Sequence, residues 1–183
     1  MEDPIKTSDS RVAYQNQWIT IHEDTTIKSD GSDGLYGYLE SNDSVCIVVV
    51  DQQEGIYLQR SFRYPTKSWG WELPGGSSDG EGVQTASRRE LREETGIEAE
   101  QIDILGYTLV CNGLMTERQY TCIASGLKLG GARTETEEAV NGARFFTPNE
   151  IDDMIESGEI DDNQTLTGLY LAQRIQKKRR RNV

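Results

Sequence analysis

Hydrophobic and polar positions along the chain divide it into short extended segments and three helices. Residues 44–51, SVCIVVVD, form an apolar and β-branched run, which is typical of a central strand buried in a sheet. Residues 56–64, IYLQRSFRY, alternate after the turn QQEG and are predicted to be the hairpin partner of that strand. Further extended segments are expected at residues 18–27, 36–41, 69–76, 102–111, 117–127 and 143–147.

The helices follow from their spacing and from their end signals. Helical signals begin near Val83 and end at Gly96, a residue type that commonly ends a helix. A second helix is predicted over residues 147–160, with Thr147 as N-cap and Pro148 at the first helical position. The third covers residues 164–181. Strands, one helix, more strands and two helices predict an α/β fold, a mixed α/β/α sandwich rather than a strictly alternating parallel one.

Length and composition place this pattern in a globular protein. The chain has 183 residues, of which 35% are hydrophobic and 27% charged. We expect a flexible N-terminus at residues 1–12, a single domain over residues 13–176 and a basic tail at residues 177–183. The longest apolar run, residues 45–50, is too short to span a membrane, and no signal peptide is visible.

The net charge and the positions of the cysteines limit which classes of binding partner and which cellular compartment we expect. The net charge of −12 argues against nucleic-acid binding, because the phosphate backbone would be repelled. The cations KKRRR at residues 177–181 are interpreted as a solvated helix end, with binding of an anionic partner as the alternative. Cys46, Cys111 and Cys122 form neither a disulfide framework nor a zinc pattern, so a reducing cytoplasm is expected.

Residues 74–97, PGGSSDGEGVQTASRRELREETGI, hold the candidate chemistry. On an ideal helix one side, an arc of roughly 100°, begins apolar, turns acidic and ends apolar. Its members are Val83, Ala86, Glu90, Glu93, Glu94 and Ile97. Partly buried carboxylates repel one another unless something compensates them, and Arg89 could neutralise one. The others need a cation, and hard oxygen ligands favour Mg²⁺ or Mn²⁺. A charged surface helix is the alternative interpretation.

The spacing of this stretch resembles the Nudix box, G-x5-E-x7-R-E-U-x-E-E-x-G-U. The matching residues are Gly75, Glu81, Arg89, Glu90, Leu91, Glu93, Glu94, Gly96 and Ile97. Residues 60–76, RSFRYPTKSWGWELPGG, are similar to the segment before the box in ADP-ribose pyrophosphatases and related nucleoside-diphosphate-sugar hydrolases. Residues 116–127 and 134–140, TERQYTCIASGL and TETEEAV, resemble their later segments. The resemblance covers roughly residues 15–175 and implies a Nudix-type sandwich with a catalytic loop-helix-loop.

The register of the Gly-Gly turn departs from most family members. There the second glycine of a Pro-Gly-Gly turn opens the box, which here would be Gly76. Counting from Gly76 places Gly82 where a glutamate should stand, so the match holds only from Gly75. Glu81 is therefore the least secure residue of the box.

The resemblance implies hydrolysis of a nucleoside diphosphate linked to another moiety, with divalent cations and an activated water. Glu90 and Glu94 are expected to be the principal ligands of Mg²⁺ or Mn²⁺, with Glu93 beside them. A backbone carbonyl at Gly75 would complete the coordination. Arg89 would orient the carboxylates rather than touch substrate. A bound cation neutralises the diphosphate and lowers the pKa of the attacking water, so the chemistry is coherent.

The resemblance also implies a general base and a substrate site. Relatives often take the base from an acidic loop after the box, here Glu135, Glu137 and Glu138, of which Glu137 or Glu138 is favoured. A glutamate of the box helix and a merely solvated loop are the alternatives. The expected substrate-binding residues are Arg60, Arg63, Glu72 and Glu117. Tyr64, Trp69 and Trp71 either stack on a base or simply pack. His22 is not expected to be catalytic.

The sequence is compatible with three functions. The first is hydrolysis of ADP-ribose or a related nucleoside diphosphate sugar to a nucleoside monophosphate and a sugar phosphate. Residues 110–115, VCNGLM, lack the proline that ADP-ribose-specific relatives usually carry there, which weakens the ADP-ribose assignment. The second is a Nudix hydrolase of nucleoside triphosphates or capped RNA, and the third is a non-catalytic metabolite-binding regulator. Relatives are commonly homodimers that exchange N-terminal strands, so residues 14–40 are candidate dimerisation strands.

Overall fold

The computed structural model describes residues 3–129 and 140–181, which form two compact units. The first unit ends at Asn42 and also includes Leu109–Arg118, and the second contains Asp43–Thr108 and the chain from Gln119 onward. The sequence predicts one domain over residues 13–176, whereas the structure divides this range at Asn42. In the described part of the chain, every helix is too short or too polar to cross a membrane.

The first unit is a three-stranded antiparallel sheet in the order β1-β2-β3. Its strands are β1 (Ile5–Gln15), β2 (Thr20–Lys28) and β3 (Asp33–Glu40). Strand β1 corrects the expectation that residues 1–12 lack regular structure. All residues of β1 are exposed, so the strand has no buried apolar face. Its sequence therefore lacks the pattern that would predict an extended segment. Leu39 of β3 is bonded to the 109–118 segment, through its N–H to Leu114 O at 2.8 Å.

The second unit is built on a seven-stranded mixed sheet, whose main path runs β10-β5-β4-β9-β8. Strands β4 and β9 are parallel, and β5 pairs antiparallel with β4, β6 and β10. The predicted hairpin of residues 44–51 and 56–64 is confirmed by the β4–β5 pairing. The strands are β4 (Ser44–Asp51), β5 (Gly55–Arg63), β6 (Ser68–Glu72), β7 (Gly75–Ser77), β8 (Ile97–Leu109), β9 (Arg118–Leu129) and β10 (Val140–Phe146).

Three helices complete the second unit: α1 (Val83–Thr95), α2 (Pro148–Ser157) and α3 (Asn163–Arg181). The predicted C-cap of α1 is confirmed, since Gly96 is left-handed at φ 69° and its N–H donates to Arg92 O. The predicted N-cap of α2 is also confirmed. Thr147 accepts from the Glu150 N–H and the Glu150 carboxylate accepts from the Thr147 N–H, which is a complete capping box.

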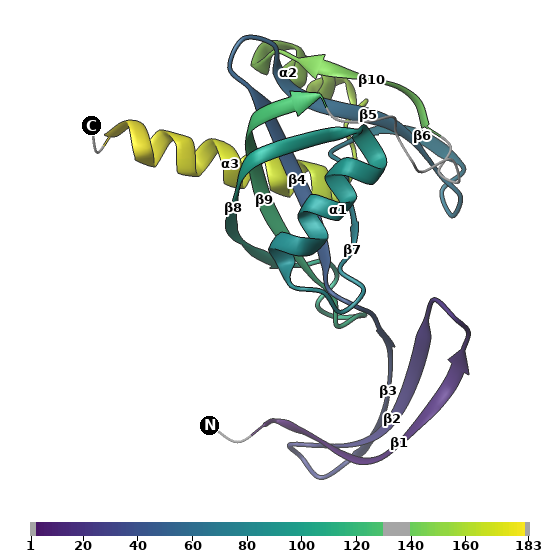
Figure 1. The fold of residues 1–183 in the computed structure, drawn as a ribbon. Coiled ribbons are helices and arrows are strands. Elements are labelled where there is room, and N and C mark those ends of the chain that lie inside the picture. Colours follow the sequence, from purple (N-terminus) through teal and green to yellow (C-terminus); the bar gives the residue numbers. More distant parts are fainter. Residues whose placement is uncertain (1–2, 130–139, 182–183) are drawn as a thin grey trace. The chain divides into compact units, whose positions relative to one another are not determined.

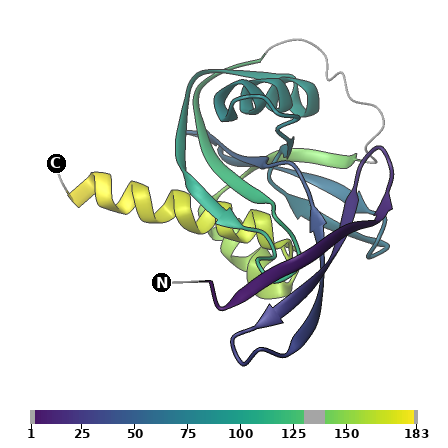
Figure 2. The same ribbon diagram turned by 90° about the horizontal axis from the view of Figure 1, so that it is seen from below.

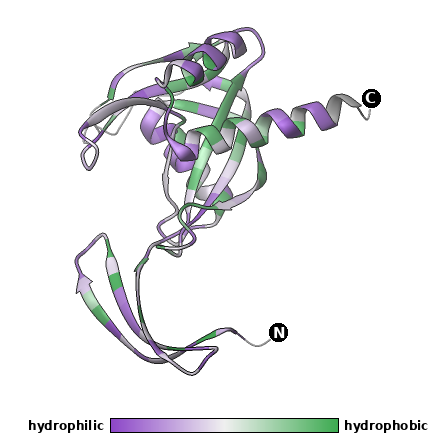
Figure 3. Ribbon diagram, turned by 180° about the vertical axis from the view of Figure 1, so that it is seen from behind, coloured by the Kyte–Doolittle hydropathy of each residue, from purple (hydrophilic) through white to green (hydrophobic). Residues whose placement is uncertain are grey.

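The helices cover both faces of the sheet in the second unit, with α1 on one side and α2 and α3 on the other (Figures 1 and 2). Successive residues of β4 point to opposite faces, so each face has its own apolar core. Ile47 and Val49 pack in the cluster that includes Leu91 of α1. Val48 packs in the cluster that includes Leu169 of α3. Figure 3 shows the hydrophobic colour concentrated on these central strands. The predicted mixed α/β/α sandwich is confirmed.

Candidate active site

The inner face of α1 is the face that the sequence predicts to gather carboxylates. Ala86 is buried on this face, and Ile97, which the sequence places on the same helix side, is buried as the first residue of β8. Between them, Glu90 is 5% and Glu94 only 2% exposed, whereas the side chain of Glu93 is 26% exposed. A solvated surface helix does not bury two carboxylates, so the alternative of a merely charged surface is wrong. Burial of two negative groups one turn apart demands compensation from the surrounding structure.

The Gly-Gly turn brings strand β7 against these carboxylates. Val45 and Cys46 of β4 pair with Gly76 and Gly75 respectively. A Cβ atom on Gly76 would lie 2.8 Å from the carboxylate carbon and both oxygens of Glu90. A Cβ atom on Gly75 would lie 2.1 Å from the carbonyl oxygen of Val45. Both glycines are therefore required, Gly76 by the carboxylate and Gly75 by the neighbouring strand.

Glu94 is held by two donors from different strands. The backbone N–H of Gly75 donates to Glu94 Oε2 at 2.8 Å, and the side-chain Nε2 of Gln59 donates to the same oxygen at 3.1 Å. Gln59 lies in β5 and is 2% exposed. The sequence does not single out Gln59, because a polar residue in an alternating strand also fits a solvent-facing position. Only the register of β5 shows that it faces α1.

Arg89 joins the helix to the loop that precedes it. Its Nε donates to Glu81 Oε2 at 2.9 Å, and its Nη1 donates to Glu90 Oε1 at 2.7 Å and Glu93 Oε2 at 3.2 Å. Nη2 donates to the carbonyl oxygen of Ser77 at 2.8 Å. The hydrogen bond that Arg89 donates to Glu81 is the largest of the effects that raise the pKa of Arg89 above its already high ordinary value. Glu81 thus belongs to the cluster, in the register that begins at Gly75.

A second polar group lies on the same face of the sheet as Gln59. Alternate residues of β5 share a face, so Arg63 is on the side of Gln59, and Glu72 lies directly opposite Gln59 in β6. Arg63 Nε lies 3.0 and 3.1 Å from the two oxygens of Glu72, and Nη2 lies 2.6 Å from Oε2. Glu72 is 4% exposed, whereas the side chain of Arg63 is 53% exposed. These two residues, each expected from sequence to bind substrate, therefore contact each other, with the fork of Arg63 turned onto Glu72.

Arg60 is not brought to the carboxylates. It is adjacent to Gln59 in β5 and so points to the opposite face, where its guanidinium lies 5.8 Å from the ring centre of Trp69. Trp71 also packs there, edge-on against Phe146 at 4.8 Å between ring centres. These two tryptophans therefore pack against protein side chains. Tyr64, by contrast, is 74% exposed at the β5–β6 turn.

The remaining predicted residues lie elsewhere. Glu117 belongs to the first unit, as does His22, which is bonded to Glu40 at 2.6 Å and stacked on Tyr38. The candidate bases Glu135, Glu137 and Glu138 fall in residues 130–139, outside the described residues.

The donor set of this face fits a hard divalent cation. Within residues 3–129 and 140–181, no group of three or more Asp, Glu, His or Cys side chains is arranged to hold a metal ion by itself. The structure instead provides the buried pair Glu90 and Glu94, beside a turn kept open by the missing side chain of Gly76. Mg²⁺ is commonly bound by one or two carboxylates while it keeps water and contacts substrate phosphates. This pair could therefore hold a cation that polarises a phosphate and activates water.

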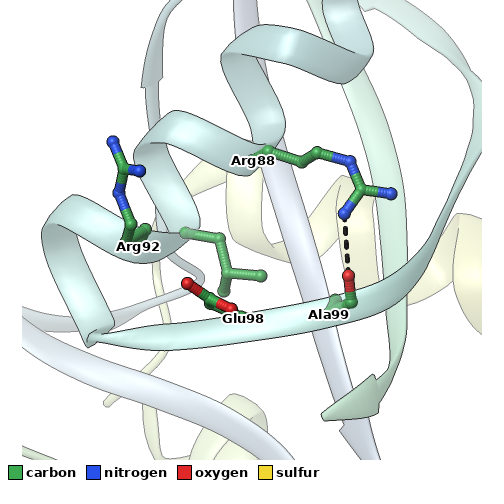
Figure 4. A pocket seen from close by; sticks show the side chains of 5 residues that line it. Arg88, Arg92, Glu98 and Ala99 are labelled. Carbon is green, nitrogen blue, oxygen red and sulfur yellow. Dashed lines mark hydrogen bonds between the residues drawn. The ribbon is translucent and has the colours of Figure 1, made fainter. Parts of the chain in front are cut away.

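A separate hollow lies between α1 and the beginning of β8, and Figure 4 shows it from close by. It is lined by Arg88, Leu91, Arg92, Glu98 and Ala99. In Figure 4 the guanidinium of Arg88 points to β8, where Nη1 donates to the carbonyl oxygen of Ala99 at 2.7 Å. Helical spacing places Arg88 and Arg92 on the side of α1 opposite Glu90 and Glu94, so this hollow is distinct from the carboxylate face.

Two families of known proteins match successive parts of this chain. Residues 40–167 match the family model described as NUDIX domain. Residues 5–39 match the model described as nucleoside diphosphate sugar hydrolase N-terminal domain. The boundary between the two matches lies close to Asn42, where the first unit ends.

Individual relatives match over most of the chain. A CMP-5'-(N-acetyl-N-hydroxy-3-aminopropyl)phosphonate hydrolase of Streptomyces rubellomurinus is 27% identical over 160 residues, which cover 87% of this chain and 77% of that protein. An ADP-ribose pyrophosphatase of Mycobacterium tuberculosis is 25% identical over 171 residues, 92% and 83% of the two chains. A crystal structure of an ADP compounds hydrolase superposes with a TM-score of 0.87 at 19% identity, covering 97% and 96%, and shows the same fold.

Proposed function

We propose that this chain, which belongs to the NUDIX family, hydrolyses the pyrophosphate bond of ADP-ribose or a related nucleoside diphosphate sugar. The products are a nucleoside monophosphate and a sugar phosphate. The match of residues 5–39 to the N-terminal domain of nucleoside diphosphate sugar hydrolases is the observation that carries this assignment. The names of the two relatives that match over most of the chain point the same way, since each describes cleavage of a nucleotide joined to a further group.

The proposed mechanism assigns a role to each residue of the carboxylate face. Glu90 and Glu94 would hold the divalent cation, proposed to be Mg²⁺, with Glu93 beside them, and the carbonyl of Gly75 would be a further ligand. When bound, the cation neutralises the diphosphate and lowers the pKa of the attacking water. Arg89 fixes the carboxylates through its bonds to Glu90 and Glu93 and anchors them to the preceding loop. Its hydrogen bond to Glu81 ties the guanidinium to the loop before the helix.

Substrate contacts are proposed on the Arg63 side of the sheet. The half-exposed guanidinium of Arg63 contacts a substrate phosphate, and the buried Glu72 holds it in place. Arg60 is not retained in this role, because it stacks on Trp69 on the other face of the sheet. Glu137 or Glu138 remains the prediction for the general base, with Glu93 as the alternative, and Glu117 remains a prediction for substrate binding.

The test of this function is a product assay with Mg²⁺ across ADP-ribose, GDP-mannose, UDP-glucose and dGTP. We expect AMP and ribose 5-phosphate from ADP-ribose, or the corresponding monophosphate and sugar phosphate from another nucleotide sugar. A preference for dGTP with release of pyrophosphate would overturn the substrate class. Binding of these compounds without any turnover would instead support the regulator.

We also propose that the protein is a homodimer that associates through the first unit. One face of its sheet carries exposed apolar side chains, because Tyr14 lies opposite Ile21 and Leu35 lies opposite Thr25 in the register. Tyr14, Ile21, Ile27 and Leu35 are 52%, 36%, 41% and 67% exposed. Glu23 and Thr25 lie on this face between Ile21 and Ile27, so the apolar side chains alternate with polar ones. Exposed apolar side chains grouped on one sheet face are typical of an interface, and a second copy supplies a matching face.

Leu35→Asp is expected to convert the dimer to a monomer, because the new carboxylate would be buried without a partner at the interface. Leu35 is largely exposed in the single chain, so its replacement should leave the fold of the monomer intact. Sedimentation velocity measures the change, and Ser29→Asp in the turn between β2 and β3 is the control. A Leu35→Asp variant that sediments as a dimer would refute this interface.

A cytoplasmic location is proposed from the state of the thiols. Cys46 and Cys122 are free and buried, and burial raises the pKa of both, so they stay protonated and unreactive. Cys111 is free and exposed, which suits a reducing compartment.

A further inference from the structure

Gln59 is a buried amide in direct contact with the carboxylate face. It is paired on both sides, with Ala143 of β10 and with Glu72 of β6, so its backbone position is fixed. Its side chain is directed at α1, where Nε2 lies 3.1 Å from Glu94 Oε2. A glutamine that is 2% exposed costs free energy unless its polar atoms are satisfied, so the contact of its amide with Glu94 offsets the cost of burying it.

The contact fixes one oxygen of Glu94. The Gly75 N–H reaches the same oxygen at 2.8 Å, so two N–H donors from two strands converge on Oε2. Two donors on one oxygen determine both the rotamer and the plane of the carboxylate, and therefore the direction in which its other oxygen is presented. Donors that orient a ligating side chain in this way commonly change metal affinity by roughly tenfold to a hundredfold.

The Gln59 amide that contacts Glu94 is neutral, whereas the Arg89 guanidinium that contacts Glu90 is charged. Glu90 is fixed by the positive charge of Arg89, which competes with a bound cation for the same carboxylate. The Gln59 amide and the Gly75 N–H orient Glu94 without adding positive charge beside it. Arg89 also bonds Glu93 and Glu81, so its one charge is spread over several carboxylates.

We infer that Gln59 is a positioning residue that orients Glu94 toward the divalent cation without touching substrate. This inference rests on the proposed function, in which Glu94 is a cation ligand. It predicts that removal of the amide weakens the cation site while the substrate contacts near Arg63 are unaffected.

The test is Mn²⁺ binding to the full-length protein, followed through the electron paramagnetic resonance signal of free Mn²⁺. Gln59→Met keeps the length of the side chain and removes the donor, and we expect about tenfold weaker Mn²⁺ binding. At saturating Mg²⁺ the KM for the substrate should stay within about twofold of wild type while kcat falls. Gln59→Asn withdraws the amide by one methylene and should show the same loss, so the test does not depend on one variant folding.

The matched control is Gln119→Met in β9. Gln119 is 1% exposed and donates to the carbonyl oxygen of Gln164 at 3.1 Å, so it is an equally buried glutamine with a partner in α3. It should lose stability and keep its Mn²⁺ affinity. Wild-type Mn²⁺ affinity in folded Gln59→Met and Gln59→Asn, beside a weakened Glu94→Gln, would overturn this inference alone. Wild-type affinity in Glu94→Gln as well would overturn the proposed role of Glu94 as a cation ligand, while the product assay tests the hydrolysis itself.

Discussion

Glu94→Gln is expected to lower kcat/KM at least about a hundredfold, because a neutral amide replaces a charged cation ligand. The fold should survive this change. The amide oxygen of the new side chain can accept the bonds that Gly75 and Gln59 now donate to Oε2. Replacing a buried charge with a neutral group of the same shape also removes a desolvation cost, so thermal unfolding without cation should occur no lower than in wild type.

The measurements are steady-state kinetics with Mg²⁺, Mn²⁺ titration and thermal unfolding in the presence of a chelator. Glu98→Gln is the control, since Glu98 is an exposed carboxylate beside the hollow on the other side of α1. Near-normal turnover by Glu94→Gln would refute the assignment of Glu94 as a ligand. Loss of activity together with a collapse in stability would show that Glu94 serves the fold instead.

The carboxylate face could be predicted because it depends on local rules. Helical spacing alone places Glu90 and Glu94 on one side, and the flanking Ala86 and Ile97 show that this side is buried. The ends of α1 and α2 follow from Gly96, Thr147 and Pro148 in the same way, since a cap acts within one turn of its own residue.

The faces of the sheet could not be predicted, because they depend on pairings between distant strands. Gln59 and Arg60 are both polar, adjacent and part of one alternating pattern, yet one reaches Glu94 and the other stacks on Trp69. A shift of one residue in register would exchange them. Arg60 was therefore as reasonable a candidate as Arg63 from sequence, and Gln59 gave no signal at all.

In the first unit, the segments that form β2 and β3 were predicted to be extended, whereas β1 was missed for a physical reason. Every residue of β1 is exposed, so this strand has no buried face. Residues 5–15 therefore carry no alternation of apolar and polar positions that would predict a strand. Its strand character rests on pairing with β2, from Ile5 opposite Lys28 to Gln15 opposite Thr20. Strands stabilised mainly by backbone pairing are recognisable from their partner and not from their own side chains.

Gly76→Ala is expected to lower activity roughly tenfold to a hundredfold with little change in stability, by the loss that misplacing a ligating carboxylate causes. The new methyl group would lie 2.8 Å from the Glu90 carboxylate, which is the end of a flexible side chain and can move aside. Its displacement would break the bond to Arg89 at 2.7 Å and weaken the cation site. Steady-state kinetics measure the activity, Mn²⁺ titration measures the cation affinity, and urea denaturation measures the free energy of unfolding.

Gly75→Ala should show the reverse pattern, because its methyl group would meet the carbonyl oxygen of Val45, a backbone atom in a central strand. We expect a loss of about 3 kcal/mol in the free energy of unfolding, since overpacking there must move the β4–β7 pairing. Gly82→Ala is the control, as no heavy atom lies within 4 Å of its added Cβ. Comparing the two variants also tests whether the two glycines have separate roles. Gly75 begins the box register in which Glu81 contacts Arg89, and Gly76 leaves room for the Glu90 carboxylate. Equal losses of stability in both variants would contradict that division.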